Sequence, residues 1–232
     1  QYRSLEIDSS GKFALMTLNT FNKGRLDGFF RRSFRKLKKQ HIQNLVIDIR
    51  SNGGGRVALS TLLTRYISRK PFKIADSLFA RSGTLRPYTK YIKGKWLNNI
   101  ELKFISRKRS DGLYHIGHLE KKWFYPKKNN HYNGDVYVLT NGPTFSAAAL
   151  FANAVKGQEG ILLLGEETGG GWHGNDGIMI PEIILPHTKV RIRLPLFRLV
   201  QFNHTPKTGT GIIPDVYIGT SYDALKKGYD KI

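Results

Sequence analysis

Ser146 is the residue of this chain whose position best suits it to chemistry. It lies in the sequence Gly-Pro-Thr-Phe-Ser-Ala-Ala-Ala (142–149), between an apolar run typical of a strand (136–140) and one typical of a helix (150–155). Free backbone N–H groups and the helix dipole at such a turn favour developing negative charge. A serine held there could act as a nucleophile with an oxyanion site beside it. Helix capping is the alternative role, since serine is a common N-cap residue.

A second glycine-rich turn, Asn52-Gly53-Gly54-Gly55, follows an apolar run of the buried-strand type at 44–50. Glycines let a backbone approach a ligand closely and aim its N–H groups at it. The turn lacks the Gly-Lys-Ser/Thr of a phosphate-binding loop and the G-x-G-x-x-G spacing of a dinucleotide site. Both turns follow strands of the parallel type, where α/β active sites collect. A purely structural strand-to-helix turn is the alternative.

The elements that must position these turns alternate between strand and helix. Strands are predicted at 13–18, 44–50, 136–140 and 161–164, and helices at 26–39 and about 57–67. This alternation predicts an α/β layered fold. After residue 171 the chain turns to β structure, with strands expected at 178–180, 190–194 and 215–218. We expect one domain over residues 1–232, in which the less regular, Lys- and aromatic-rich segment from about 70 to 133 is an insertion or lid.

The composition excludes several classes of function. There are 38 Lys and Arg against 17 Asp and Glu, a net charge of +21, but the charge is spread along the chain and no nucleic-acid-binding motif accompanies it. We therefore expect a solvated basic surface and no nucleic-acid partner. The chain has no cysteine, and no apolar run reaches the roughly 20 residues of a transmembrane helix. The pair His115 and His118 lies on a predicted strand or loop with no cysteine or acid pair beside it, and no metal or cofactor is expected.

Four motifs in order extend this interpretation. They are Leu-Val-Ile-Asp-Ile-Arg-Ser-Asn-Gly-Gly-Gly (45–55), the segment 138–148, Leu-Gly-Glu-Glu-Thr-Gly-Gly (164–170) and Gly-Ile-Ile-Pro-Asp (211–215). Over about residues 10–220 the chain resembles the C-terminal processing (tail-specific) serine protease family. The resemblance implies Ser146 as nucleophile and the N–H groups of Gly54 and Ala147 as oxyanion hole. It also implies a ββα-spiral core shared with ClpP and crotonase, a peptide or protein substrate, and an extracytoplasmic location in the periplasm or on the cell surface.

The chain departs from the family in the base that activates the serine. Many members place a lysine shortly after the G-E-x-T turn, whereas here Gly171, Trp172 and His173 follow, and no lysine occurs before Lys189. A serine without a neighbouring base is a weak nucleophile. The leading hypothesis is a serine endopeptidase of the tricorn-like Ser–His type, whose histidine comes from a segment upstream of Gln1.

Two alternatives stay open. An internal histidine could serve as the base, with His173 the nearest candidate; the others are His115, His118, His131 and His204. Otherwise the domain is catalytically inactive and binds peptides or glycans on the same fold.

Overall fold

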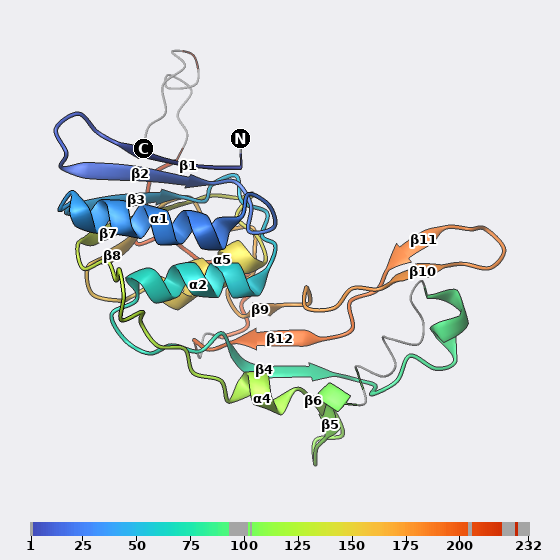
Figure 1. Cartoon of the computed structure of the whole chain (residues 1–232). Coiled ribbons are helices and arrows are strands. Elements are labelled where there is room, and N and C mark those ends of the chain that lie inside the picture. The colour runs from blue at the N-terminus through green and yellow to red at the C-terminus, as the bar shows by residue number, and fades with distance from the viewer. Residues whose placement is uncertain (1, 93–101, 103, 204–205, 220–225, 227–232) are drawn as a thin grey trace. The chain divides into compact units, whose positions relative to one another are not determined.

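The computed structural model describes residues 2–92, 102, 104–203, 206–219 and 226 (Figure 1). The chain divides into two compact units. The first contains Gln1–Phe72, Trp123–His173 and Thr205–Ile232, and the second contains Lys73–Lys122 and Gly174–His204. In the described part of the chain, no helix combines the length and the apolar character needed to cross a membrane.

The first unit is built on a six-stranded sheet in the order β1-β2-β3-β7-β8-β13. Its strands are β1 (Arg3–Ile7), β2 (Phe13–Leu18), β3 (Asn44–Asp48), β7 (Asp135–Thr140), β8 (Ile161–Gly165) and β13 (Val216–Tyr217). Only the β1–β2 pair is antiparallel. In the parallel register Ile47 faces Val138, which faces Leu163. The carboxyl ends of β3, β7 and β8 therefore meet at one edge, which brings the turns that follow them together.

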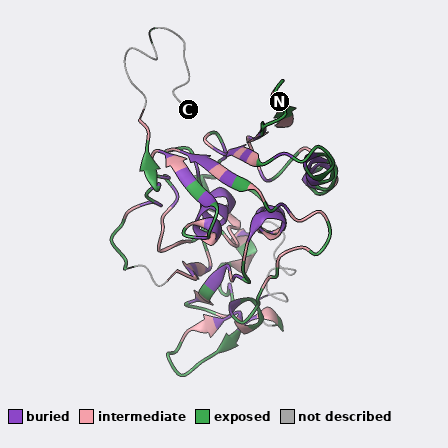
Figure 2. Ribbon diagram, turned by 90° about the vertical axis from the view of Figure 1, so that its left-hand side faces the viewer, coloured by how far each residue is buried: buried purple, intermediate pink, exposed green. Residues whose placement is uncertain are grey.

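One face of this sheet carries the hydrophobic core. Leu45 and Ile47 of β3 are fully buried, and on β8 Leu163 is buried while its neighbour Leu162 is 44% exposed. The core is completed by α1 (Leu26–Lys39), α2 (Val57–Ile67) and α5 (Ala147–Val155), with α2 in contact with both other helices. Figure 2 shows buried residues along the strands and the helices. The predicted mixed α/β fold is confirmed, and the two glycine-rich turns follow neighbouring strands of this sheet.

The motif at 211–215 leads into β13, the edge strand next to β8. The Asp215 carboxylate accepts the N–H of Leu163 at 2.8 Å and also pairs with Lys156. The backbone N–H of Asp215 donates to the Leu163 carbonyl at 2.8 Å. Asp215 therefore ties the segment that leads into β13 to β8, and its contacts are structural.

The second unit contains a five-stranded antiparallel sheet in the order β5-β6-β4-β12-β9. Its strands are β4 (Ala75–Ala80), β5 (Arg107–Lys108), β6 (Tyr114–His115), β9 (Gly174–Asn175) and β12 (Arg198–Gln201). The unit also holds η1 (Tyr88–Tyr91), α4 (Gly117–Glu120) and a hairpin of β10 (Glu182–Ile184) and β11 (Arg191–Arg193). Ordered strands thus run through part of the segment predicted to be less regular.

The prediction of a strand at 178–180 is wrong. Residues 178–180 form no strand, and the neighbouring strands are β9 and β10. The backbone here makes single hydrogen bonds, from Leu196 N–H to Met179 and from Leu194 N–H to Pro181. Pro181 has no N–H of its own to continue a ladder, so the apolar run packs without strand pairing.

Candidate active site

Ser146 has a backbone conformation that serine rarely adopts. It links β7 to α5 with φ of +50° and ψ of −120°, and its side chain makes no capping hydrogen bond to the helix. A non-glycine residue in such a region costs about 1–3 kcal/mol and persists only where the surroundings enforce it. A strained serine at a sharp strand-to-helix turn is the geometry of a nucleophile elbow, which presents the hydroxyl outward. The capping role considered from the sequence is therefore wrong.

Hydrogen bonds to carbonyl groups that follow β3 hold the Ser146 turn in place. The Thr144 hydroxyl donates to the Ile49 carbonyl at 3.1 Å, and the Phe145 N–H donates to the Asn52 carbonyl at 3.1 Å. Thr144 is itself fully buried. These bonds join segments almost 100 residues apart in sequence, and they fix the chain immediately before Ser146.

The third glycine-rich turn, after β8, packs against the same loop. Gly169 N–H donates to the Gly142 carbonyl at 3.0 Å, and Gly170 N–H donates to the Thr144 carbonyl at 2.9 Å. A Cβ at Gly169 would lie 2.2 Å from that same carbonyl oxygen of Gly142. The three motifs predicted to act together are thus in direct contact around Ser146.

Gly54, in the turn after β3, lies directly against the Ser146 turn. Its φ is +101°, and a Cβ built on it would lie 2.7 Å from the Ser146 Cβ, 2.8 Å from the Phe145 carbonyl oxygen and 3.0 Å from the Ala147 nitrogen. No side chain fits there, and the backbone conformation itself favours glycine. The structure therefore brings Ser146, Gly54 and the Ala147 N–H together.

Asn52 is a site residue whose role is not predicted from the sequence. Its fully buried carboxamide donates to the Leu18 carbonyl at 2.9 Å and accepts the Gly54 N–H at 2.9 Å. The sequence signal for this role is an asparagine two residues before a glycine, because the asparagine side chain mimics a backbone turn. The Gly54 N–H thus already has a partner. The Ala147 N–H has no hydrogen-bond acceptor among the residues that the structure describes.

The structure describes four of the five histidines considered as bases. Among the described residues, no hydrogen bond joins the Ser146 hydroxyl to any histidine. Next to His173, the Trp172 indole donates to Asn153, towards the C-terminal end of α5, whereas Ser146 precedes its N-terminus. His131 bonds to the Ser68 carbonyl. His115 and His118 belong to the second unit, and His204 lies outside the described residues.

The model of peptidase family S41 matches residues 12–218. The chain belongs to peptidase family S41. This confirms the predicted relation to the C-terminal processing proteases. No curated protein sequence matches the chain.

Solved structures share the fold of this S41 chain at low sequence identity. A candidate peptidase from Parabacteroides merdae is 18% identical with a TM-score of 0.68, and the match covers 100% of this chain and 62% of that one. Mature CPAF complexed with lactacystin is 15% identical with a TM-score of 0.66, covering 97% and 51%. The photosystem II D1 C-terminal processing protease is 19% identical with a TM-score of 0.55, covering 94% and 48%. The chain thus spans between about half and three-fifths of these proteins.

Proposed function

We propose that this chain is the catalytic domain of a serine endopeptidase in which Ser146 attacks the carbonyl carbon of a peptide bond. The observation that carries the proposal is the conformation of Ser146: its backbone is strained, its side chain does not cap α5, and it packs against Gly54. Strain of this kind gives no stability to a helix end, and nucleophile elbows use it to expose a hydroxyl. Membership of family S41 independently supports peptidase chemistry.

The negative charge that develops on the attacked carbonyl oxygen needs fixed donors. In the proposed site Ala147 supplies the principal one, because its N–H has no acceptor among the described residues and lies beside Ser146. Gly54 supplies the second, sharing its N–H with Asn52. One donor of this type contributes about 3 kcal/mol to stabilisation of the transition state. Asn52 acts as a positioning residue that holds the second donor.

The base in this proposal is a histidine from outside the 232 residues, as in Ser–His designs. Two observations support it: no lysine follows the turn after β8 before Lys189, and no described histidine bonds to Ser146. A serine hydroxyl needs such a partner to become nucleophilic at neutral pH. His173 is the weaker internal alternative.

Three finer proposals rest on the family resemblance. The parallel β3-β7-β8 core, with α2 and α5 in contact, is compatible with the ββα-spiral class of ClpP and crotonase. The substrate binds in an extended form, its main chain hydrogen-bonded beside a strand. The protein acts outside the cytoplasm.

A fluorophosphonate probe on the full-length protein tests the nucleophile directly. We expect covalent labelling that mass spectrometry maps to Ser146, with labelling and peptide hydrolysis both abolished in Ser146→Ala. The matched control is Ser51→Ala, because Ser51 is an exposed serine next to the Asn52 turn and should leave labelling intact. Undiminished labelling in the Ser146→Ala protein would refute the proposal.

The second candidate function is a peptide- or glycan-binding module without turnover, favoured by the missing lysine. It predicts saturable binding of peptide or glycan by the full-length protein, with no probe labelling and no cleavage products. Labelling at Ser146 would exclude it.

A further inference from the structure

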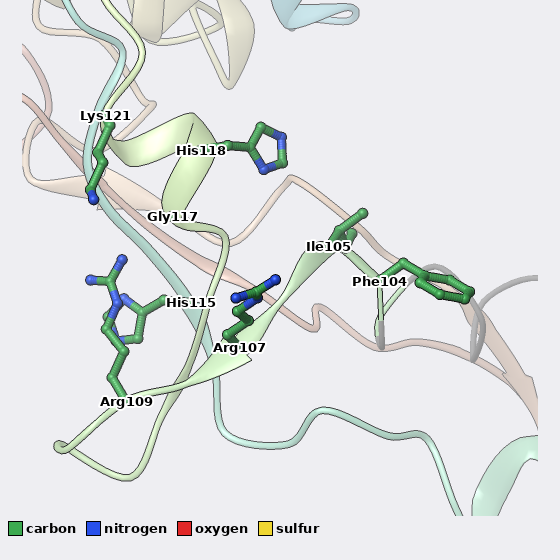
Figure 3. Close-up of a pocket in the computed structure, with 8 residues that line it drawn as sticks. All are labelled: Phe104, Ile105, Arg107, Arg109, His115, Gly117, His118 and Lys121. Carbon is green, nitrogen blue, oxygen red and sulfur yellow. The ribbon is translucent and has the colours of Figure 1, made fainter.

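The second unit contains a basic pocket that the proposed peptidase chemistry does not use (Figure 3). Its volume is about 410 Å³, within the usual range of ligand pockets. All its lining residues belong to the second unit: Phe104, Ile105, Arg107, Arg109, His115, Gly117, His118 and Lys121. No acidic residue is among them, so the wall of the pocket is cationic and partly apolar.

A buried carboxylate behind the pocket fixes part of this wall. Glu120 is 5% exposed; it accepts the Leu78 N–H at 2.8 Å, pairs with the His115 Nδ1 at 2.7 Å, and binds the Arg109 guanidinium. Burial opposes the negative charge, but these three partners outweigh it, and the pKa of Glu120 lies below its ordinary value. Glu120 stays ionised and holds Arg109 and His115 in fixed positions.

His115 has no free ring nitrogen to offer a ligand. Its Nε2 lies 2.8 Å from the Asp111 carboxylate, so both ring nitrogens are bonded to acids. The Leu113 N–H and His115 hold the pKa of Asp111 below its ordinary value. The two acids next to the pocket are therefore occupied by Arg109 and His115.

Two further cations, Arg107 and Lys121, line the pocket. Among the described residues, neither Arg107 on β5 nor Lys121 has an acidic partner. Figure 3 shows the Lys121 ammonium directed towards the Arg109 guanidinium. Gly117 leaves room for that guanidinium, since a Cβ there would lie 2.9 Å from one of its nitrogens. Because Arg107 and Lys121 have no acidic partner among the described residues, their charges give the pocket a positive potential that an anion relieves.

The lining also distinguishes between kinds of anion. Arginine presents a planar fork of donors that matches a carboxylate or a phosphate. Beside the cations lie two apolar side chains, Ile105 and the 82%-exposed Phe104. This apolar surface suits the hydrocarbon stem of an acidic side chain. A free phosphate ion has no apolar part to contact it.

We propose that this pocket binds side-chain carboxylates of an acidic peptide segment. Arg107 and Lys121 hold the carboxylates, Arg109 is kept in place by Glu120, and Phe104 with Ile105 covers the apolar part of the peptide. This binding site goes beyond the proposed hydrolysis and does not depend on it. An experiment can therefore refute the proposal for Ser146 without refuting the proposal for the pocket, and the reverse.

Fluorescence anisotropy on the full-length Ser146→Ala protein tests the site without turnover. The probes are a fluorescein-labelled glutamate-rich peptide and the same peptide with glutamine at each glutamate. We expect Arg107→Gln and Lys121→Gln each to weaken binding of the glutamate peptide about tenfold, which corresponds to about 1.4 kcal/mol. The matched control is Lys108→Gln, because Lys108 follows Arg107 on β5, is exposed, and does not line the pocket. It removes the same charge, and we expect less than about a twofold change.

Three results would overturn the proposal. Equal weakening by Arg107→Gln and Lys108→Gln would show general attraction to a chain of net charge +21. Equal binding of the glutamine peptide would show that carboxylates are not recognised. Inorganic phosphate that binds more tightly than the peptide and displaces it at matched ionic strength would assign the pocket to phosphate.

Discussion

Replacing Gly54 by alanine places a methyl group where the structure has no room for one. The added Cβ would lie 2.7 Å from the Ser146 Cβ and 2.8 Å from the Phe145 carbonyl oxygen, and φ at this position is +101°. The left-handed conformation costs a residue with a Cβ about 1–2 kcal/mol, before the clash is relieved. Because one of the clashing atoms is backbone, relief requires the Ser146 turn to move. We expect the free energy of unfolding to fall by about 1–3 kcal/mol.

The same substitution should also slow the reaction of Ser146. Moving a reacting group by about 1 Å can cost 100-fold in rate, and losing one oxyanion donor costs a similar factor. We therefore expect the rate of fluorophosphonate labelling of the Gly54→Ala protein to fall at least about 100-fold, measured alongside thermal unfolding.

The control for this substitution is the neighbouring glycine. A Cβ at Gly53 would meet nothing within 4 Å, and its φ is not in the positive region. Gly53→Ala should label at close to the wild-type rate. If Gly54→Ala and Gly53→Ala label equally fast, the argument that Gly54 shapes the oxyanion site is refuted.

Three other substitutions separate structural from functional contacts. Asp215→Ala should cost about 1–3 kcal/mol of unfolding free energy, because it orphans the Leu163 N–H, yet leave probe labelling unchanged; a labelling defect in the folded protein would contradict this. The lowered pKa of Glu120 gives stability that is present above its ordinary pKa of 4.5 and is lost as pH falls through the lower folded value. In Glu120→Gln, the free energy of unfolding should therefore depend less on pH below about pH 5 than in the wild type. An unaltered pH dependence would show that Glu120 does not contribute to acid denaturation. Gly117→Ala should displace the Arg109 guanidinium and weaken acidic-peptide binding with little change in melting temperature, as titration and thermal unfolding would show.

Local signals were sufficient to predict the elements around the candidate site. The strand at 13–18 and the helix at 26–39 have the predicted bounds, and β7, α5 and β8 lie within a few residues of theirs. Each is an apolar or amphipathic run ended by glycine or a polar turn, so its neighbours in sequence decide its structure.

The contacts that shape the site could not be predicted in the same way. The positive φ of Ser146 is held by groups on the turn after β3, which the sequence shows only as a glycine-rich stretch. The carboxamide of Asn52 donates to the Leu18 carbonyl because the pairing of β2 with β3 places the ends of these strands side by side. In the second unit, β4 pairs with both β6 and β12, and its own sequence alternates too weakly to predict a strand.

The pairing of β4 with β12 has a consequence for how the protein folds during synthesis. The local strand β6 covers one edge of β4, but β12, on the other edge, is made about 120 residues later. At about 5–20 residues per second, that edge waits on the order of 10 s for its partner. An unpaired edge strand is a template for intermolecular pairing. The nascent chain thus passes through an interval in which aggregation competes with folding, and chaperone holding during that interval should raise the yield of native protein.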